Sequence, residues 1–191
     1  MRLLCFINIA LSMLLLAGCD SSILEEFPTY EQSSLVEVGD KAPSFTATLV
    51  DGGSVSLSDY RGASLILILF SHTCPDCEML LDDLQALIDA KVQLPAILAI
   101  GRDATSEELL VYRSEHGYSI PMISDASRSI FNLYATTYVP RVYLIDPEGC
   151  IAKMLIEYES HYLDELIVRT QENDSPKEDT ADNRGRDRGL R

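Results

Sequence analysis

The sequence predicts an α/β fold in which helices flank a central mixed sheet, and three features support this prediction. The run Leu65 to Phe70 is entirely apolar, as expected of a strand buried on both faces. A segment with leucines at helical spacing follows it, and a second apolar run, Ala96 to Ile100, comes next. Strand, helix and strand in succession indicate a parallel pair. Two later strand-like runs around a tight turn indicate an antiparallel pair, so the sheet is expected to be mixed.

The first elements can be assigned in chain order. Pro43 to Leu57, with Asp51-Gly52-Gly53 at its middle, indicates a β-hairpin that extends the domain on its N-terminal side. The strand from Leu65 leads into a helix whose apolar stripe consists of Leu80, Leu81, Leu84, Leu87 and Ile88. Further on, Thr105-Ser106-Glu107-Glu108 has the capping-box pattern, which predicts a helix to about Gly117.

The second half of the chain continues the alternation. Met122 to Ser124 is expected to be a short extended segment, and Asp125 can cap a turn of helix after it. Val142 to Asp146 and Ile151 to Ile156 flank a Pro- and Gly-containing turn and are expected to pair as a hairpin. A last helix is predicted from about Ser160, with an apolar face formed by Leu163, Leu166 and Ile167.

The tetrapeptide Cys74-Pro75-Asp76-Cys77 stands between the first predicted strand and its helix. At a helix start, free backbone N–H groups and the positive end of the helix dipole stabilise a thiolate, so Cys74 is the candidate nucleophile. Cys77 is close enough to form a disulfide with it, and Pro75 fits the first helical turn because its missing N–H costs nothing there. Asp76 adds a carboxylate that should disfavour the thiolate and make the couple more reducing. We therefore predict redox catalysis by Cys74 and Cys77, tuned by Pro75 and Asp76.

A Cys-x-x-Cys can instead be half of a zinc site, which needs a second pair of Cys or His ligands. The sequence has no second such motif, and His72, His116 and His161 are scattered. We expect no metal, and because the cysteines themselves carry the electrons no cofactor is implied. Cys150 follows a turn and has no obvious partner, so it is expected to be a strand-start residue. A resolving or intermolecular cysteine is the alternative.

The N-terminus has the pattern of an export signal. Arg2 precedes an apolar stretch that reaches Leu16 and ends in small residues, which is too short to be expected as a membrane span. The sequence Leu16-Ala17-Gly18-Cys19 resembles the lipobox of bacterial lipoproteins, which implies that Cys19 is lipidated and anchors the protein to a membrane of the bacterial cell envelope. A plain secretory signal is the alternative.

These features divide the chain into four expected parts: a signal peptide at 1–18, a tether at 19–35, a single domain at 36–170 and a disordered tail at 171–191. The tether is polar and acidic with little periodicity. The tail has no apolar periodicity, and its acidic first half gives way to a stretch with arginines at positions 184, 186, 188 and 191.

The chain is strongly acidic, with a formal net charge of −15. Removing residues 1–18 would delete one basic residue, Arg2, and no acidic residue, which would bring the net charge to −16. Such a surface argues against binding to nucleic acid, because a phosphate backbone is held by Lys and Arg. It should also mildly repel other anionic partners.

Several motifs in combination resemble the thioredoxin fold. They are a strand ending in Phe70, the CPDC tetrapeptide at the next helix start, and the dipeptide Val139-Pro140 opening a late strand. The leader at 38–45 (VGDKAPSF) and the segment at 56–62 (SLSDYRG) are similar to the envelope-anchored branch that contains TlpA and ResA, which is related to the AhpC/TSA redoxins. Peroxiredoxins share the leader. The resemblance covers about 135 residues, the expected domain.

The resemblance implies a cis peptide bond at Pro140 beside the cysteines, a geometry that proline permits at modest cost. The backbone of Val139 would then pair with an extended substrate peptide and hold its cysteine near Cys74. Thioredoxins carry an aromatic residue before the first cysteine and a buried acid six positions before it; this chain has Thr73 and Ile68 there. Deprotonation of Cys77 would therefore depend on Asp76, Glu78 or water.

The implied enzyme is a thiol–disulfide oxidoreductase of the envelope that faces the periplasm or the exterior. It would reduce protein disulfides, take electrons from an upstream thiol donor, and be held at the membrane by its lipid anchor. One alternative is a peroxiredoxin-like peroxidase, although Leu67 and Ser71 stand where peroxiredoxins have proline and threonine. The other is a non-catalytic binding module in which Cys74 and Cys77 form a structural disulfide.

Overall fold

The computed structural model describes residues 27–158 and residue 163. The expected signal peptide, the lipidation site Cys19 and the tail at 171–191 lie outside the described residues. Most of the helix expected from about Ser160 does too, although Leu163 is helical and buried.

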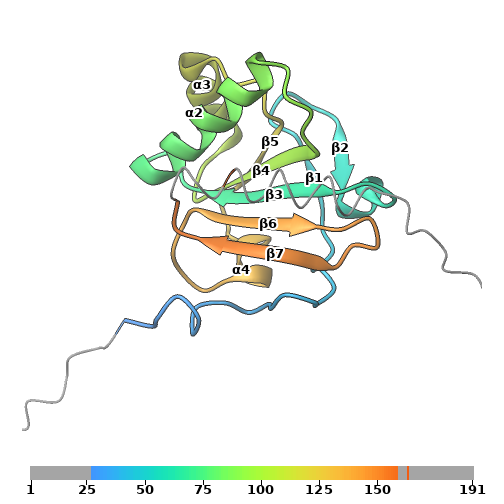
Figure 1. Cartoon of the computed structure of the whole chain (residues 1–191). Helices are drawn as coiled ribbons and strands as arrows, with labels where there is room; N and C mark the ends of the chain where they lie inside the picture. The colour runs from blue at the N-terminus through green and yellow to red at the C-terminus, as the bar shows by residue number, and fades with distance from the viewer. Residues whose placement is uncertain (1–26, 159–162, 164–191) are drawn as a thin grey trace, which may run out of the picture.

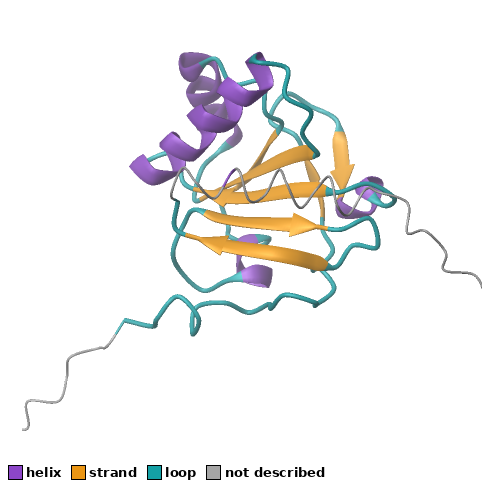
Figure 2. Cartoon of the chain, viewed as in Figure 1, coloured by secondary structure: helices purple, strands orange, loops and turns teal. Residues whose placement is uncertain are grey.

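A five-stranded mixed sheet forms the centre of the domain, and a separate two-stranded hairpin stands beside it (Figures 1 and 2). In the large sheet the strand order is β5-β4-β3-β6-β7, with β3, β4 and β5 parallel and β6 and β7 antiparallel to their neighbours. The strands are β1 (Thr46–Thr48), β2 (Ser54–Ser56), β3 (Leu65–Phe70), β4 (Ala96–Arg102), β5 (Met122–Asp125), β6 (Arg141–Ile145) and β7 (Ile151–Ile156).

The central strand β3 is fully buried and divides the core into two clusters, one on each face. Its even-numbered residues, Ile66, Ile68 and Phe70, face the cluster built with α2 (Pro75–Asp89) and α3 (Ser106–His116). Its odd-numbered residues face the cluster that includes α4 (Phe131–Tyr134) and the N-terminal segment. Figure 1 shows α2 and α3 lying together on one side of the sheet. A short 3-10 helix, η1 (Leu57–Tyr60), follows β2.

The fold confirms the predicted α/β class and most of the predicted elements. β1 and β2 pair antiparallel within the predicted hairpin, β3 and β4 pair in parallel, and β6 and β7 form the expected antiparallel pair. The strand predicted at Val142 to Asp146 starts and ends one residue earlier. The N-cap residue of α4 is Ile130 rather than Asp125, but Asp125 does bind the start of the helix, because its Oδ2 accepts hydrogen bonds from the backbone N–H groups of Ile130 and Phe131.

The end of the expected tether differs from a spacer. Ser33 is completely buried, the Leu35 N–H donates to the Tyr134 carbonyl, and the Thr136 N–H donates to the Ser33 carbonyl. Figure 1 shows this blue segment running below α4 and β7. Its partners lie about a hundred positions further along the chain, which is why composition alone suggested a linker.

None of the helices within residues 27–158 is long and apolar enough to cross a membrane.

The capping box of α3 gives a test of local stability. The Glu108 N–H donates to Thr105 Oγ1 at 3.2 Å, and the Thr105 N–H donates back to Glu108 Oε2 at 2.8 Å. We expect Thr105→Ala to lower the free energy of unfolding by about 1 kcal/mol, because one helix-end donor loses its partner. Urea denaturation measures this. The exposed neighbour Ser106, which has no capping bond, is the control, and an equal loss in Ser106→Ala would contradict the capping account.

Candidate active site

The two cysteines of the CPDC motif lie at the start of α2, just beyond the carboxyl end of β3. Cys74 is the N-cap residue of the helix, with extended backbone angles, and Pro75 occupies the first turn as predicted. The Cys74 carbonyl accepts the Glu78 N–H at 3.1 Å, which closes the first turn. Both thiols are free, and they differ in exposure: Cys74 is partly exposed, whereas Cys77 is completely buried. The more accessible sulfur therefore belongs to the residue at the helix end where backbone N–H groups are free, although no helix N–H bonds its side chain.

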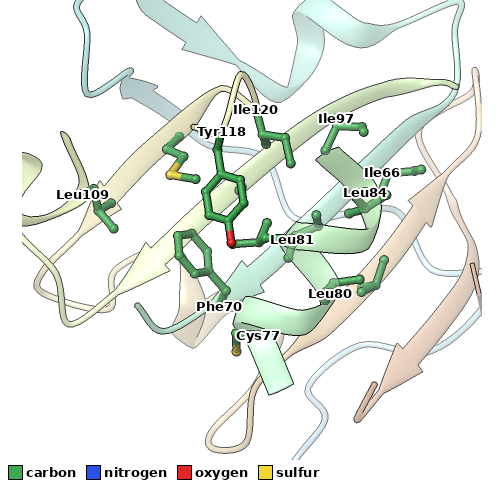
Figure 3. Packing of buried hydrophobic residues seen from close by; sticks show 14 of the residues in the cluster. Ile66, Phe70, Cys77, Leu80, Leu81, Leu84, Ile97, Leu109, Tyr118 and Ile120 are labelled. Carbon is green, nitrogen blue, oxygen red and sulfur yellow. The ribbon is translucent and has the colours of Figure 1, made fainter. Parts of the chain in front are cut away.

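Cys77 belongs to the apolar core. Figure 3 shows its side chain at the end of α2 nearest to Phe70, in line with Leu80 and Leu81 on the buried face of the helix. Burial raises the pKa of the Cys77 thiol well above its usual range. A backbone hydrogen bond at Ser71 and the positive charge of Arg102 oppose this rise, and the neighbouring Cys74 sulfur adds to it. Cys77 is therefore held as a protonated thiol at neutral pH.

The loop before β6 supplies the third part of the site. The Val139–Pro140 peptide bond is cis, as predicted. The Val139 carbonyl oxygen accepts a hydrogen bond from Cys74 Sγ at 3.8 Å. The structure thus brings Val139 and Pro140 together with the two cysteines, although Val139 is 65 positions from Cys74 in the sequence. Only the family resemblance predicted that they would meet.

Asp76 and Glu78 are exposed residues in the first turn of α2. At that position a carboxylate also interacts favourably with the positive end of the helix dipole. Ile68 is completely buried in the core beneath the helix, so no carboxylate is present at the position where thioredoxins bury one. The tuning role of Asp76 and the proton acceptor for Cys77 remain predictions.

Sequence reasoning missed several polar groups near the cysteines. The Tyr118 hydroxyl donates to Asp82 Oδ1 at 2.6 Å, and burial raises the pKa of the neighbouring Tyr112 to about 12. The guanidinium of Arg102, at the end of β4, lies 4.8 Å from the centre of the Phe131 ring. Arg102 could have been noticed in the sequence, because an arginine ends an otherwise apolar strand there. Tyr112 and Tyr118 could not, because aromatic residues are common in cores.

A hollow of about 550 Å³ lies between the start of α2 and one face of α3, next to the CPDC motif. Half of its lining residues are glutamates. The Glu78 carboxylate lies 3.8 Å from His116 Nδ1, and the lining contains no Lys or Arg. The titratable lining residues are His72, Glu78, Glu107, Glu108, Tyr112, Glu115 and His116.

Cys150 is not part of this site. It lies in the turn between β6 and β7, at the opposite end of β6 from Pro140, and its N–H donates to Asp146 Oδ1 at 2.7 Å. A strand of that length places it about 17 Å from the end of β6 that adjoins Pro140. Within residues 27–158 and residue 163, no three His, Cys, Asp or Glu side chains are grouped closely enough to hold a metal ion.

Comparison with known proteins gives the family. Residues 38–154 match the AhpC/TSA family. The chain is 27% identical to the thiol-disulfide oxidoreductase ResA of Geobacillus kaustophilus over 147 residues, which are 76% of this chain and 83% of that protein. It is 30% identical over 120 residues to a Mycobacterium tuberculosis protein provisionally named a peroxiredoxin, covering 62% of this chain and 76% of that one.

The solved structures agree on the fold. The structure of a protein from Bacteroides thetaiotaomicron, provisionally named a protein disulfide isomerase, superposes with a TM-score of 0.68 at 29% identity, over 74% of this chain and 92% of that chain. The thioredoxin domain of a Bacteroides vulgatus thiol-disulfide oxidoreductase gives 0.59 at 20% identity, over 72% and 97%. The chain therefore belongs to the AhpC/TSA family and is an oxidoreductase of the ResA type, built on a thioredoxin-like fold.

Proposed function

We propose that this protein reduces disulfide bonds in proteins of the bacterial cell envelope, with Cys74 as the attacking residue and Cys77 as the resolving residue. One observation carries the proposal: an accessible thiol at a helix start faces the Val139 carbonyl beside a cis proline, with a buried thiol directly behind it. Thiol–disulfide exchange needs this asymmetry, because one sulfur must attack the substrate and the other must react only after the mixed disulfide has formed.

The reaction proceeds in two exchanges. Cys74 as thiolate attacks one sulfur of the substrate disulfide, the substrate S–S bond breaks, and the departing sulfur takes up a proton. Cys77 then gives up its proton and attacks Cys74, which breaks the mixed disulfide and releases the second substrate thiol. The substrate gains two electrons and two protons, and Cys74–Cys77 becomes a disulfide. An upstream thiol donor reduces it again.

The backbone next to Pro140 supports recognition of an extended peptide. The backbone at Val139 lies outside the strands of the sheet and next to Cys74. Hydrogen bonds from the substrate main chain to it would hold the substrate cysteine over Cys74. Main-chain hydrogen bonds do not depend on most substrate side chains, so we expect the site to accept a broad set of protein disulfides. Asp76 favours the reducing direction by the electrostatic argument given above.

The proposed location rests on the N-terminal sequence. Residues 1–18 as a signal peptide and Cys19 as a lipidated residue would place the domain outside the cytoplasm and attached to a membrane. We retain the proposed division into tether, domain and tail, with the modification that residues 28–35 pack on the domain.

A thiol peroxidase is the second candidate, favoured by the resemblance to a protein provisionally named a peroxiredoxin. In that reaction the Cys74 thiolate would attack a peroxide oxygen and become a sulfenic acid. Leu67 and Ser71, at positions where peroxiredoxins carry proline and threonine, weigh against it.

Cysteine variants separate the candidates. We expect Cys74→Ser to abolish reduction of a protein disulfide, and Cys77→Ser to accumulate a mixed disulfide with substrate, because the resolving step is lost. Non-reducing gels and mass spectrometry detect the adduct, with Cys150→Ser as the control. Peroxide consumption that survives Cys77→Ser but not Cys74→Ser would favour the peroxidase. A Cys74–Cys77 disulfide with a potential below about −300 mV would favour a structural role.

The burial of Cys77 predicts unequal alkylation. In a reduced Cys150→Ser background at pH 7, iodoacetamide should modify Cys74 and leave Cys77 almost unmodified. In Cys74→Ser, the modification of Cys77 should rise about tenfold per pH unit through pH 9 without a plateau, because its pKa in the folded protein is raised by burial and the thiolate fraction is still increasing there. Rapid modification of Cys77 at pH 7, or a plateau below pH 9, would contradict this assignment.

The acidic hollow predicts a charge preference. At low salt we expect cystamine, a cationic disulfide, to react roughly tenfold faster than the anionic oxidised glutathione, and added salt should narrow the ratio. The double variant Glu107→Gln/Glu115→Gln should also lower the ratio of the cystamine rate to the glutathione rate. The control Glu37→Gln/Glu148→Gln changes the net charge equally at exposed residues outside the hollow, so it should leave most of the preference intact. Equal effects of the two double variants would show that only net charge matters.

A further inference from the structure

Arg141, the residue immediately after the cis proline, is completely buried. None of the carboxylates within residues 27–158 forms an ion pair with it. A guanidinium removed from water without an opposite charge is costly unless its N–H groups are well satisfied by hydrogen bonds. A charged residue at this place therefore calls for an explanation beyond packing.

The hydrogen bonds of Arg141 point in two directions. Toward the active-site loop, Nε donates to the Thr137 carbonyl at 3.1 Å and to the Tyr138 carbonyl at 3.3 Å, and Nη2 donates to the Thr137 carbonyl at 3.0 Å. Toward the N-terminal segment, Nη1 donates to Ser34 Oγ at 2.8 Å and Nη2 donates to Ser33 Oγ. One side chain thus joins the residues just before Val139 to a segment more than a hundred positions earlier in the chain.

The same loop and segment are joined around Arg141 by further contacts. The Tyr138 hydroxyl donates to the Pro28 carbonyl at 2.8 Å, and its ring lies 4.6 Å from the ring of Tyr30. Tyr138 itself has a φ of 63°, a left-handed conformation that is uncommon for a bulky residue and needs support from its surroundings. The N-terminal segment supplies that support.

We propose that Arg141 is a positioning residue for substrate binding and that residues 28–36 are a working part of the substrate site. By holding the carbonyls of Thr137 and Tyr138, Arg141 fixes the two peptide planes that precede Val139. The orientation of the Val139 backbone, which faces Cys74, follows from them. Ser33 and Ser34 hold the guanidinium in place from the other side. This inference rests on the proposed function for its substrate, a peptide disulfide bound by its main chain.

The test uses the double variant Ser33→Ala/Ser34→Ala, which leaves Arg141 and the reactive groups in place. KM and kcat are measured with a disulfide-containing peptide and with cystamine, which has no peptide backbone. We expect KM for the peptide to rise about tenfold with kcat little changed, because hydrogen bonds to a charged group are worth roughly that factor in an equilibrium constant. The kinetics with cystamine should be unchanged. Ser124→Ala, which removes a 2.6 Å hydroxyl bond to the Ala104 carbonyl, is the matched control and should change neither.

Amide hydrogen exchange gives a readout that needs no turnover. The Leu35 N–H joins the segment to the last residue of α4, and the Thr136 N–H joins it to the loop that follows. Both should exchange faster in the double variant and in Arg141→Lys, but not in Ser124→Ala. If wild-type protein reduces neither disulfide, the proposed function is wrong and exchange alone decides the role of Arg141. Unchanged exchange, an unchanged KM for the peptide, or equal losses with both disulfides would each overturn the proposal.

Discussion

The burial of β3 on both faces is the constraint on which the rest of the structure depends. Because apolar clusters cover both sides of the strand, its carboxyl end can deliver the chain to only one place, the edge where α2 begins. β4 on one side and β6 on the other fix its register, so the CPDC motif and the loop before β6 meet at the same edge of the sheet. The candidate redox centre is thus a consequence of strand order, and its loop residues are held on a rigid scaffold.

That scaffold gives two identical side chains opposite environments. Cys74 lies at a helix terminus, where backbone N–H groups and the dipole favour negative charge, and Cys77 lies one turn further on the buried face, where charge is disfavoured. The difference comes from their places at the helix end: Cys74 is the N-cap residue, with extended backbone angles, whereas Cys77 lies inside the first turn on the buried face. In the proposed reaction, attack and resolution would be divided between the cysteines by position rather than by chemical type.

Local patterns predicted the parts that local physics determines. The apolar run of β3, the leucine stripe of α2 and the capping box at Thr105 each encode their element within a few residues, and all three elements are present. Arg141 could not be interpreted in the same way, because Ser33 and Ser34 are more than a hundred positions away and a serine carries no signal of such a partner. For the same reason residues 28–35 resembled a spacer in composition. The cis bond at Pro140 was reached through family resemblance, as composition cannot distinguish the isomers.

The attachment of the N-terminal segment limits how far the enzyme could work from a membrane. The Pro28 carbonyl accepts a hydrogen bond from Tyr138, in the loop beside the cysteines. Only the chain before position 28 is therefore left to connect the domain to an anchor. If Cys19 carries a lipid, the stretch from 19 to 28 spans at most about 30 Å even when fully extended. The Cys74 sulfur would then reach only a thin layer of space next to the bilayer. Its substrates would be proteins that lie close to that surface rather than proteins that diffuse freely.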